Sequence, residues 1–158
     1  EQALGHLNNE LVAQELSHSQ FVTMLYAILN TRTLELVWAR AGHPSPLLLR
    51  AAGTTTELEA EGALLGIFPK EVYGAQRVQL HPGDALLLYT DGFESAFVEA
   101  GEEGLPATMG EPYWREFAKL AGEDPRGAFR RMTEALDGQA GSLHQADDLT
   151  ALLVTVGR

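Results

Sequence analysis

The spacing of apolar residues changes along the chain, and this change predicts where helices and strands lie. Leucines at positions 4, 7, 11 and 16 recur at a helical spacing, which predicts a helix over residues 3–16. Short apolar or alternating runs then predict a series of strands. These strands cover residues 21–30, 34–41, 47–50, a short stretch near Leu58, 74–80, 85–89 and 149–156. Further helices are expected to begin within 93–99 and to cover 112–121 and 125–138.

The order of these elements predicts an α+β fold with antiparallel strands packed into a layered core. Residues 21–30 and 34–41 are separated only by the short polar segment 31–33, which favours an antiparallel hairpin. No repeat, linker or low-complexity segment divides the 158 residues. We therefore expect one domain that covers residues 1–158.

Composition excludes several classes of function. The chain has no cysteine, which rules out disulfides, zinc–thiolate sites and thiol catalysis and is compatible with the cytoplasm, where we expect the protein. Eleven basic residues against 22 acidic ones give a net charge of −11, so the basic footprint of a nucleic-acid-binding protein is missing. The acidity reflects solubility or, alternatively, cation binding. No apolar run approaches the roughly 20 residues of a membrane span, so we expect no membrane segment here. The helical pattern begins at once and without a methionine, so we expect a part of a longer protein.

The run Gly83–Ala96, GDALLLYTDGFESA, places an acid directly after a buried strand. Residues 85–89 are apolar or aromatic, and Thr90, Asp91 and Gly92 follow them. A carboxylate at the edge of a core is costly unless it is hydrogen-bonded, paired or bound to a cation. The alternative is an ordinary turn, because Asp-Gly is also a turn dipeptide.

Asp147 and Asp148 mirror this arrangement, since they directly precede the predicted strand 149–156. Adjacent residues of an extended chain point to opposite faces, so only one of the two can face a given site. If the two strands are antiparallel neighbours, one of these acids meets Asp91 at the same edge of the sheet. Two carboxylates about 4 Å apart repel by about 4 kcal/mol at an effective dielectric near 20. A shared proton or a divalent cation such as Mg²⁺ or Mn²⁺ would offset that repulsion. The alternative is a solvated loop or an Asx turn.

Other candidate residues are interpreted as structural. Gly42 and Pro44 constrain a bend around His43, and a lone histidine is more often structural than catalytic. Ser45 does not lie in a G-x-S-x-G elbow, and no paired-histidine metal motif is present. The segment ALLGI, residues 63–67, lacks the pattern of a phosphate-binding loop and is interpreted as packing.

Five motifs, taken in order, resemble one family. They are FVTMLYAILN, ARAGHPSPLLLR, LLGIF, LHPGDALLLYTDGFESA and ADDLTALLV. Together they resemble the C-terminal two-thirds of the bacterial SpoIIE/RsbU-type protein serine/threonine phosphatases, within the wider PP2C-like metal-dependent group. The resemblance covers the chain from about Leu4 to Val156. It implies an αββα sandwich with a Mn²⁺ or Mg²⁺ centre and hydrolysis of phosphoserine or phosphothreonine on a protein by metal-bound water.

The same resemblance assigns roles to individual residues. Asp91 matches one metal-ligand aspartate and Asp147 matches the last one. Asp148 would orient its surroundings by hydrogen bonds, and Gly92 would allow close approach of the backbone. The Gly42-His43 motif would be mainly architectural. The implied substrate is a phosphorylated protein of the anti-anti-sigma type, which is a partner in sigma-factor regulation.

The chain also departs from the family pattern. Members carry a GGD-aromatic-aromatic-D segment and a D-x-x-GHG segment, and neither occurs in these 158 residues. Arg40 stands where asparagine is common, and Ser95 where an acid is common, with Glu94 one position early. We therefore expect half of a binuclear site and low activity from this chain alone. Two alternatives stay open: a non-catalytic binding module of the same fold, and an unrelated α+β domain. Exposed sheet edges also lead us to expect a homodimer.

Overall fold

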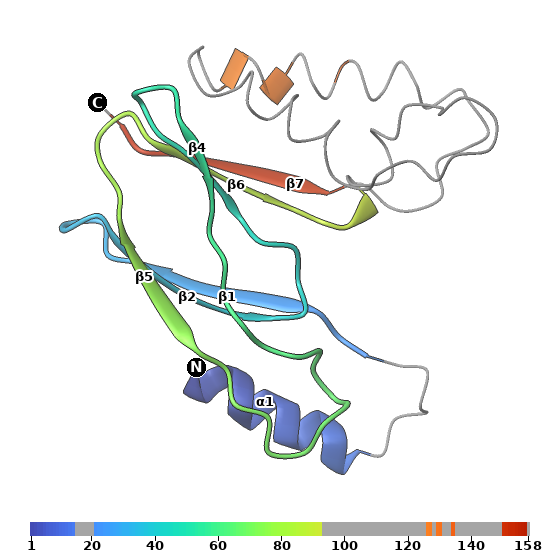
Figure 1. Ribbon diagram of the computed structural model, residues 1–158. Coiled ribbons are helices and arrows are strands. Elements are labelled where there is room, and N and C mark those ends of the chain that lie inside the picture. The colour runs from blue at the N-terminus through green and yellow to red at the C-terminus, as the bar shows by residue number, and fades with distance from the viewer. Residues whose placement is uncertain (15–20, 93–125, 128, 131–133, 135–149, 158) are drawn as a thin grey trace. The chain divides into compact units, whose positions relative to one another are not determined.

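A computed structural model describes residues 1–14, 21–92, 126–127, 129–130, 134 and 150–157 (Figure 1). The chain divides into two compact units. The first unit comprises Glu1–Ser45 with Leu58–His81, and the second comprises Pro46–Glu57 with Pro82–Arg158. Each unit is described by itself below. The expectation of one domain over residues 1–158 stays a prediction.

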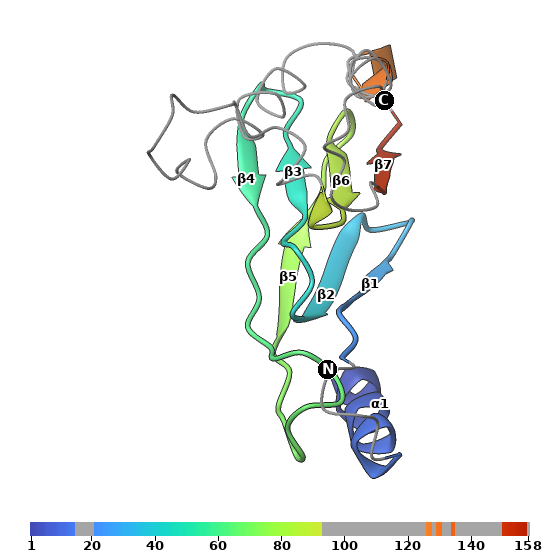
Figure 2. The same cartoon turned by 90° about the vertical axis from the view of Figure 1, so that its right-hand side faces the viewer.

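The first unit contains a three-stranded antiparallel sheet in the order β1-β2-β5 (Figure 2). β1 is Met24–Leu29, β2 is Glu35–Ala41 and β5 is Ala75–Gln79. The side chain of Asn30 closes the β1–β2 hairpin, because its Oδ1 accepts hydrogen bonds from the backbone N–H groups of Arg32 at 3.0 Å and Thr33 at 3.1 Å. This confirms the hairpin that the short polar segment 31–33 predicts.

The helix α1, Gln2–Ala13, packs on this sheet (Figure 1). Leu4 is 1% exposed and belongs to a buried cluster with two alanines of β2 and two residues of the loop that precedes β5; these partners are Ala39, Ala41, Leu65 and Tyr73. Small side chains on β2 let the helix approach closely, while its leucines fill the space. The predicted helix over residues 3–16 is thus confirmed in place.

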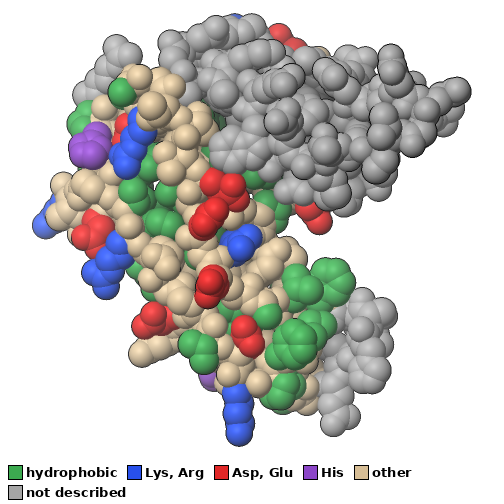
Figure 3. All heavy atoms as spheres, in the orientation of Figure 1, with side chains coloured by type: hydrophobic (Ala, Val, Ile, Leu, Met, Phe, Trp, Pro, Cys, Tyr) green, Lys and Arg blue, Asp and Glu red, His purple; other side chains and the backbone are tan. Residues whose placement is uncertain are grey.

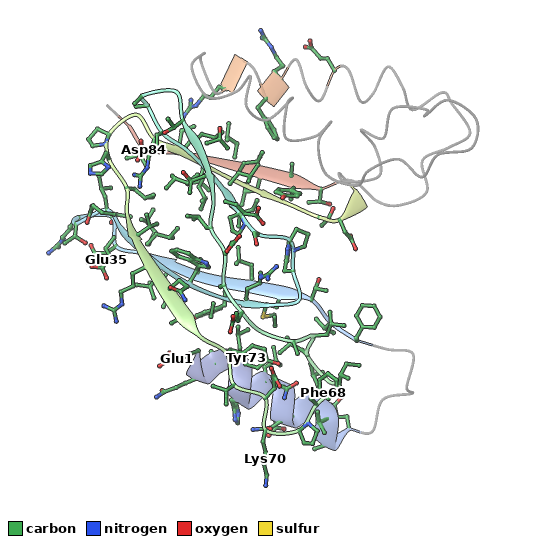
Figure 4. All side chains as sticks on the ribbon, in the orientation of Figure 1. Glu1, Glu35, Phe68, Lys70, Tyr73 and Asp84 are labelled. Atoms are coloured by element: carbon green, nitrogen blue, oxygen red, sulfur yellow. The ribbon has the colours of Figure 1, made fainter. Side chains whose placement is uncertain are left out.

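A polar contact ties α1 to the loop that precedes β5. Asn8 is fully buried, donates from Nδ2 to the Phe68 carbonyl at 2.8 Å and accepts at Oδ1 from the Gly66 N–H at 2.9 Å. Gly66 has a φ of +84°, a conformation that glycine adopts without strain. Figure 4 labels Phe68, Lys70 and Tyr73 of this loop near α1. The segment LLGIF is therefore packing, as the sequence predicts.

The second unit contains a four-stranded antiparallel sheet in the order β4-β3-β6-β7, seen edge to edge in Figure 2. Its strands are β3 (Leu47–Leu49), β4 (Thr55–Glu57), β6 (Ala85–Tyr89) and β7 (Ala151–Thr155). All three residues of β3 are buried, and so are four of the five residues of β6. The two central strands therefore form the apolar middle of this sheet, which suits their continuous leucine content.

Most predicted strands match the observed ones, with one correction. The segment 51–57 is predicted as a turn that leads to a strand near Leu58, but β4 occupies residues 55–57 and Leu58 follows it. Only residues around Gly53, whose φ is +90°, form the turn. The β-branched threonines after it pair with β3 instead.

Several predictions fall on residues outside the described part. The helices expected near 93–99 and over 112–121 belong to this group. Of the helix expected over 125–138, the five described residues, 126, 127, 129, 130 and 134, are helical. In the described residues, no helix is long and apolar enough to cross a membrane. The α+β class with antiparallel sheets is observed directly.

Large hydrophobic side chains are also exposed on the first unit. Green side chains gather in the lower part of the face that Figure 3 shows. The large exposed hydrophobic residues of this unit are Phe21, Val22, Tyr26, Ile28, Phe68 and Val72. Their exposure marks this unit as the part of the described chain with the most uncovered apolar surface.

Candidate metal-binding end of the second sheet

The antiparallel pairing of β6 with β7 decides whether the acids of the two strands can meet. Each residue of β6 has a partner in β7, from Ala85 with Thr155 to Tyr89 with Ala151. The pairing continues one residue further, because the Thr90 N–H donates to the Thr150 carbonyl at 3.0 Å. The condition that the sequence left open is therefore met: the two strands are antiparallel neighbours.

Asp91 is the first residue beyond this last pair. Its side chain is exposed, and Gly92 next to it is buried. In the described residues, the Asp91 carboxylate has no ion-pair or hydrogen-bond partner. An exposed carboxylate held by a stiff buried strand is available to a cation without first breaking a protein contact.

The opposite end of β6 carries an acid in a very different environment. Asp84 is 2% exposed and forms an ion pair with the Arg50 guanidinium, with Nη1 and Oδ2 2.8 Å apart. Its Oδ1 also accepts a hydrogen bond from the Ala51 N–H at 3.0 Å. Figure 4 labels Asp84 at the turn that leads into β6. These contacts tie the β3–β4 turn to the start of β6.

Sequence reasoning did not find the Asp84–Arg50 pair. The pattern predicts one strand that ends at Arg50 and another that begins directly after Asp84, and it does not pair the two residues. The signal was present, since each of the two residues borders a buried strand and they carry opposite charges. Their partnership depends on the antiparallel register of β3 with β6, which places Leu49 opposite Ala85.

The remaining candidate site residues lie outside the described part of the chain. This applies to Asp147 and Asp148, and also to Glu94 and Ser95. Chain connectivity still limits where the two aspartates can be, because three peptide units separate Asp147 from Thr150 and span at most about 11 Å. In the residues that are described, no group of three or more His, Cys, Asp or Glu side chains could hold a metal.

The donor chemistry of the described and nearby acids fits a hard divalent cation. Asp91 offers carboxylate oxygens, and the residues that precede Thr150 offer two more carboxylates. Oxygen donors of this kind suit Mg²⁺ and Mn²⁺, and the chain has no cysteine that would favour a softer metal. The residues present therefore fit part of such a site.

The bend at residues 42–44 is architectural, in agreement with the sequence prediction. Gly42 has a φ of +65°, and a Cβ there would collide with Leu64. The Arg40 side chain braces the bend, because its Nε donates to the Ala60 carbonyl at 2.7 Å and its Nη1 donates to the His43 carbonyl at 2.9 Å. Arg40 thus has a packing role where the family pattern has asparagine.

Tyr73, a titratable residue of the loop that precedes β5, has a shifted pKa. Tyr73 is 3% exposed, and its hydroxyl has no hydrogen-bond partner in the part of the chain that is described. Burial raises the pKa of Tyr73 above its ordinary value, and the negative charge of Glu71 raises it further. Tyr73 belongs to the first unit, so its raised pKa reports the burial of this side chain and gives no information about the proposed metal site.

Comparison with known proteins matches the whole chain to one family. The family model described as Stage II sporulation protein E (SpoIIE) matches residues 1–157. The phosphoserine phosphatase RsbU of Bacillus subtilis is 35% identical over 101 residues, which cover 63% of this chain and 30% of RsbU. The chain therefore spans under a third of that relative's length.

Solved structures show the same fold. The SiaA-PP2C domain of Pseudomonas aeruginosa superposes with a TM-score of 0.74 at 21% identity, over 96% of this chain and 58% of that one. The phosphatase domain of SpoIIE from Bacillus subtilis, in a crystal presoaked with manganese, superposes with a TM-score of 0.63 at 17% identity, over 99% of this chain and 65% of that one. The PP2C-like fold class predicted from the sequence is confirmed.

Proposed function

The chain belongs to the SpoIIE family of PP2C-type phosphatases, and on that premise we propose that it supplies half of the metal site of a protein serine/threonine phosphatase. The reaction is hydrolysis of phosphoserine or phosphothreonine on a regulatory protein. The observation that carries the proposal is the β6–β7 pairing, which runs up to Thr90 and Thr150 and ends beside Asp91.

In this proposal, Asp91 and Asp147 are metal ligands and Asp148 orients its surroundings by hydrogen bonds. β6 holds Asp91 at the end of the sheet because the strand is buried along most of its length. Gly92, which is buried and has no side chain, lets the backbone turn directly after the ligand. A bound Mn²⁺ or Mg²⁺ would lower the pKa of water and neutralise charge on the phosphoryl group.

The similarity to RsbU supports a class of substrate for the proposed phosphatase. RsbU is a phosphoserine phosphatase by name and is similar to this chain over 101 residues. This supports a phosphorylated regulatory protein as the substrate, and we propose one of the anti-anti-sigma type. The net charge of −11 favours a substrate with basic residues around its phosphorylated side chain.

The test is a phosphatase assay on the full-length protein with and without Mn²⁺. Asp91→Asn and Asp147→Asn each remove one ligand charge and are expected to abolish turnover of a phosphoserine peptide. Glu57→Gln is the matched control, because this exposed acid on β4 loses the same charge away from the proposed ligands. Turnover close to that of the wild type in either aspartate variant would exclude the metal-ligand assignment.

The alternative function is a non-catalytic binding module of the same fold, and the same assay separates the two. If the full-length protein binds a phosphorylated partner but releases no phosphate at saturating Mn²⁺, this second function replaces the first.

A further inference from the structure

The last rung of the β6–β7 ladder has an unusual acceptor. An antiparallel pair of hydrogen-bonded residues normally exchanges two backbone bonds, one in each direction. At Thr90 and Thr150 the first bond is of this kind, from the Thr90 N–H to the Thr150 carbonyl. The return bond, from the Thr150 N–H, goes instead to the Thr90 side-chain Oγ1 at 3.0 Å. A hydroxyl has thus replaced a backbone carbonyl.

At the other end of the same ladder both bonds join backbone groups, although the return bond comes from Gly83 and not from Asp84. There the Val156 N–H donates to the Asp84 carbonyl at 2.8 Å, and the Gly83 N–H donates to the Val156 carbonyl at 3.0 Å. Side-chain substitution is therefore confined to the end that carries Asp91. Local bonds from threonine hydroxyls to the backbone compete with strand ladders, which makes them suited to ending a strand at a defined residue.

The consequence of this rung is geometric. Because the Thr90 hydroxyl accepts the bond from the Thr150 N–H, the Thr90 carbonyl does not have to face β7 to keep the two residues joined. The chain turns immediately afterwards, at Asp91, and enters a helix at Gly92. The same rung holds the backbone of Thr150, which Asp148 precedes by two residues and Asp147 by three.

We propose that Thr90 is a positioning residue for the metal site, because its hydroxyl holds the end of β6, which Asp91 directly follows, to the backbone of Thr150. This inference rests on the proposed function. It assigns to Thr90 a role separate from metal ligation: its hydroxyl completes the last rung of the β6–β7 ladder directly before Asp91. Valine has the shape of threonine without the hydroxyl, so it removes this link and leaves the packing.

The experiment compares Thr90→Val, Thr90→Ser and Thr155→Val in the full-length protein. Thr155 is the matched control, because it lies at the other end of β7 and its hydroxyl accepts a bond from Arg126 Nη2 at 3.2 Å, outside the ladder. Mn²⁺ binding is measured by calorimetry without substrate. Hydrogen exchange, followed by mass spectrometry on a peptide that contains Thr150, reports the rung itself.

Thr90→Val is expected to weaken Mn²⁺ binding about tenfold, the size of effect seen when groups that orient metal ligands are removed. It should also speed exchange at Thr150. Thr90→Ser, which keeps the hydroxyl, and Thr155→Val should stay within about twofold of the wild type. Faster exchange at Thr150 with unchanged Mn²⁺ affinity would overturn the inference, and so would equal loss in Thr90→Ser.

Two further measurements cover a Thr90→Val variant that does not fold and separate this inference from the proposed function. If Thr90→Val does not fold, Thr90→Ala is compared with Thr90→Ser, and equal Mn²⁺ affinity in this pair would overturn the inference. Asp91→Asn is measured in the same calorimeter. Wild-type Mn²⁺ binding by Asp91→Asn would overturn the proposed function and this inference with it. Loss in Asp91→Asn without loss in Thr90→Val would overturn the inference alone.

Discussion

The two ends of β6 carry the same residue type in opposite environments. Asp84, before the strand, is 2% exposed and is paired with Arg50. Asp91, after the strand, is exposed and has no partner in the described part of the chain. The difference teaches that a carboxylate beside a buried strand serves stability when the fold surrounds it with donors. It is available for chemistry when the fold leaves it at the surface.

The largest expected effect is on activity at the Asp91 end. Asp91→Asn in the full-length protein removes a proposed metal ligand, and metal ions contribute several kcal/mol to such reactions, which corresponds to about a 10³-fold loss of kcat/KM. The free energy of unfolding without metal should change by less than about 0.5 kcal/mol, because the side chain is exposed. Phosphatase assays measure the loss of activity, and urea unfolding of the metal-free protein measures the change in stability. A large loss of stability in the metal-free protein would place Asp91 in the same class as Asp84.

The opposite pattern is expected for Asp84→Asn. Removing one partner of a buried ion pair leaves the other charge uncompensated and costs about 3 kcal/mol. Urea unfolding of the metal-free protein measures this loss. Activity per folded molecule should stay within a fewfold of the wild type at low temperature. If Asp84→Asn is as stable as the wild type but inactive, the division between the two ends of β6 is wrong.

Arg50→Met sharpens the comparison at the Asp84 end. This change leaves the carboxylate of Asp84, which is 2% exposed, with the Ala51 N–H but without the guanidinium, so the expected loss is about 3 kcal/mol, no smaller than for Asp84→Asn, which leaves the partly exposed Arg50. Arg50→Lys is the control, since it keeps the charge and loses the planar donor group. Urea unfolding of both variants decides whether charge or geometry holds the β3–β4 turn. A loss for Arg50→Met clearly smaller than for Asp84→Asn would contradict this ranking.

The smallest effect concerns a buried ionisable group without such a partner. The pKa of Tyr73 is raised in the folded protein, so the folded state holds this proton more tightly than the unfolded chain does. The corresponding stability is fully present below the unfolded pKa, near 10, and is lost as the pH rises through the raised folded pKa. Urea unfolding at about pH 9 and about pH 11 should therefore show a smaller loss for Tyr73→Phe than for the wild type.

Tyr26→Phe is the control for this titration, because Tyr26 is 44% exposed on β1 of the same unit. This variant controls for the removal of a tyrosine hydroxyl that is not buried. If Tyr73→Phe loses as much unfolding free energy as the wild type between about pH 9 and about pH 11, the buried hydroxyl does not contribute to the loss of stability at high pH. Burial without a charge partner would then have no measurable cost at this position.

Local pattern predicted the elements well where it was unambiguous. The apolar run 85–89 is observed as β6 with the same bounds, and the hairpin of β1 and β2 follows from the polar segment between them. The pattern failed at residues 55–57, where three polar residues form β4. Their pairing with the fully buried β3 outweighs their polar character, and such pairing is not visible in a local window.

The candidate site was predictable only in part. Asp91 and the pair Asp147–Asp148 stood out because each borders an apolar strand. Whether those strands are neighbours could not be read from the residues themselves, since any two of the strands could pair. The observed register of β6 with β7 shows that the two strands are neighbours. The structure also shows the hydrogen bond from the Thr150 N–H to the Thr90 hydroxyl, which no spacing in the sequence indicates.

The sequence by itself determined the strands, the acids that border them, the absence of cysteine and the family resemblance, because these follow from local composition and from motifs in order. Only the tertiary structure decided which acid is buried and which is exposed. That decision depends on partners distant in the chain: Arg50 lies 34 residues from Asp84, and Thr150 lies 60 residues from Thr90. A carboxylate has no fixed role of its own, because its environment sets the cost of its charge.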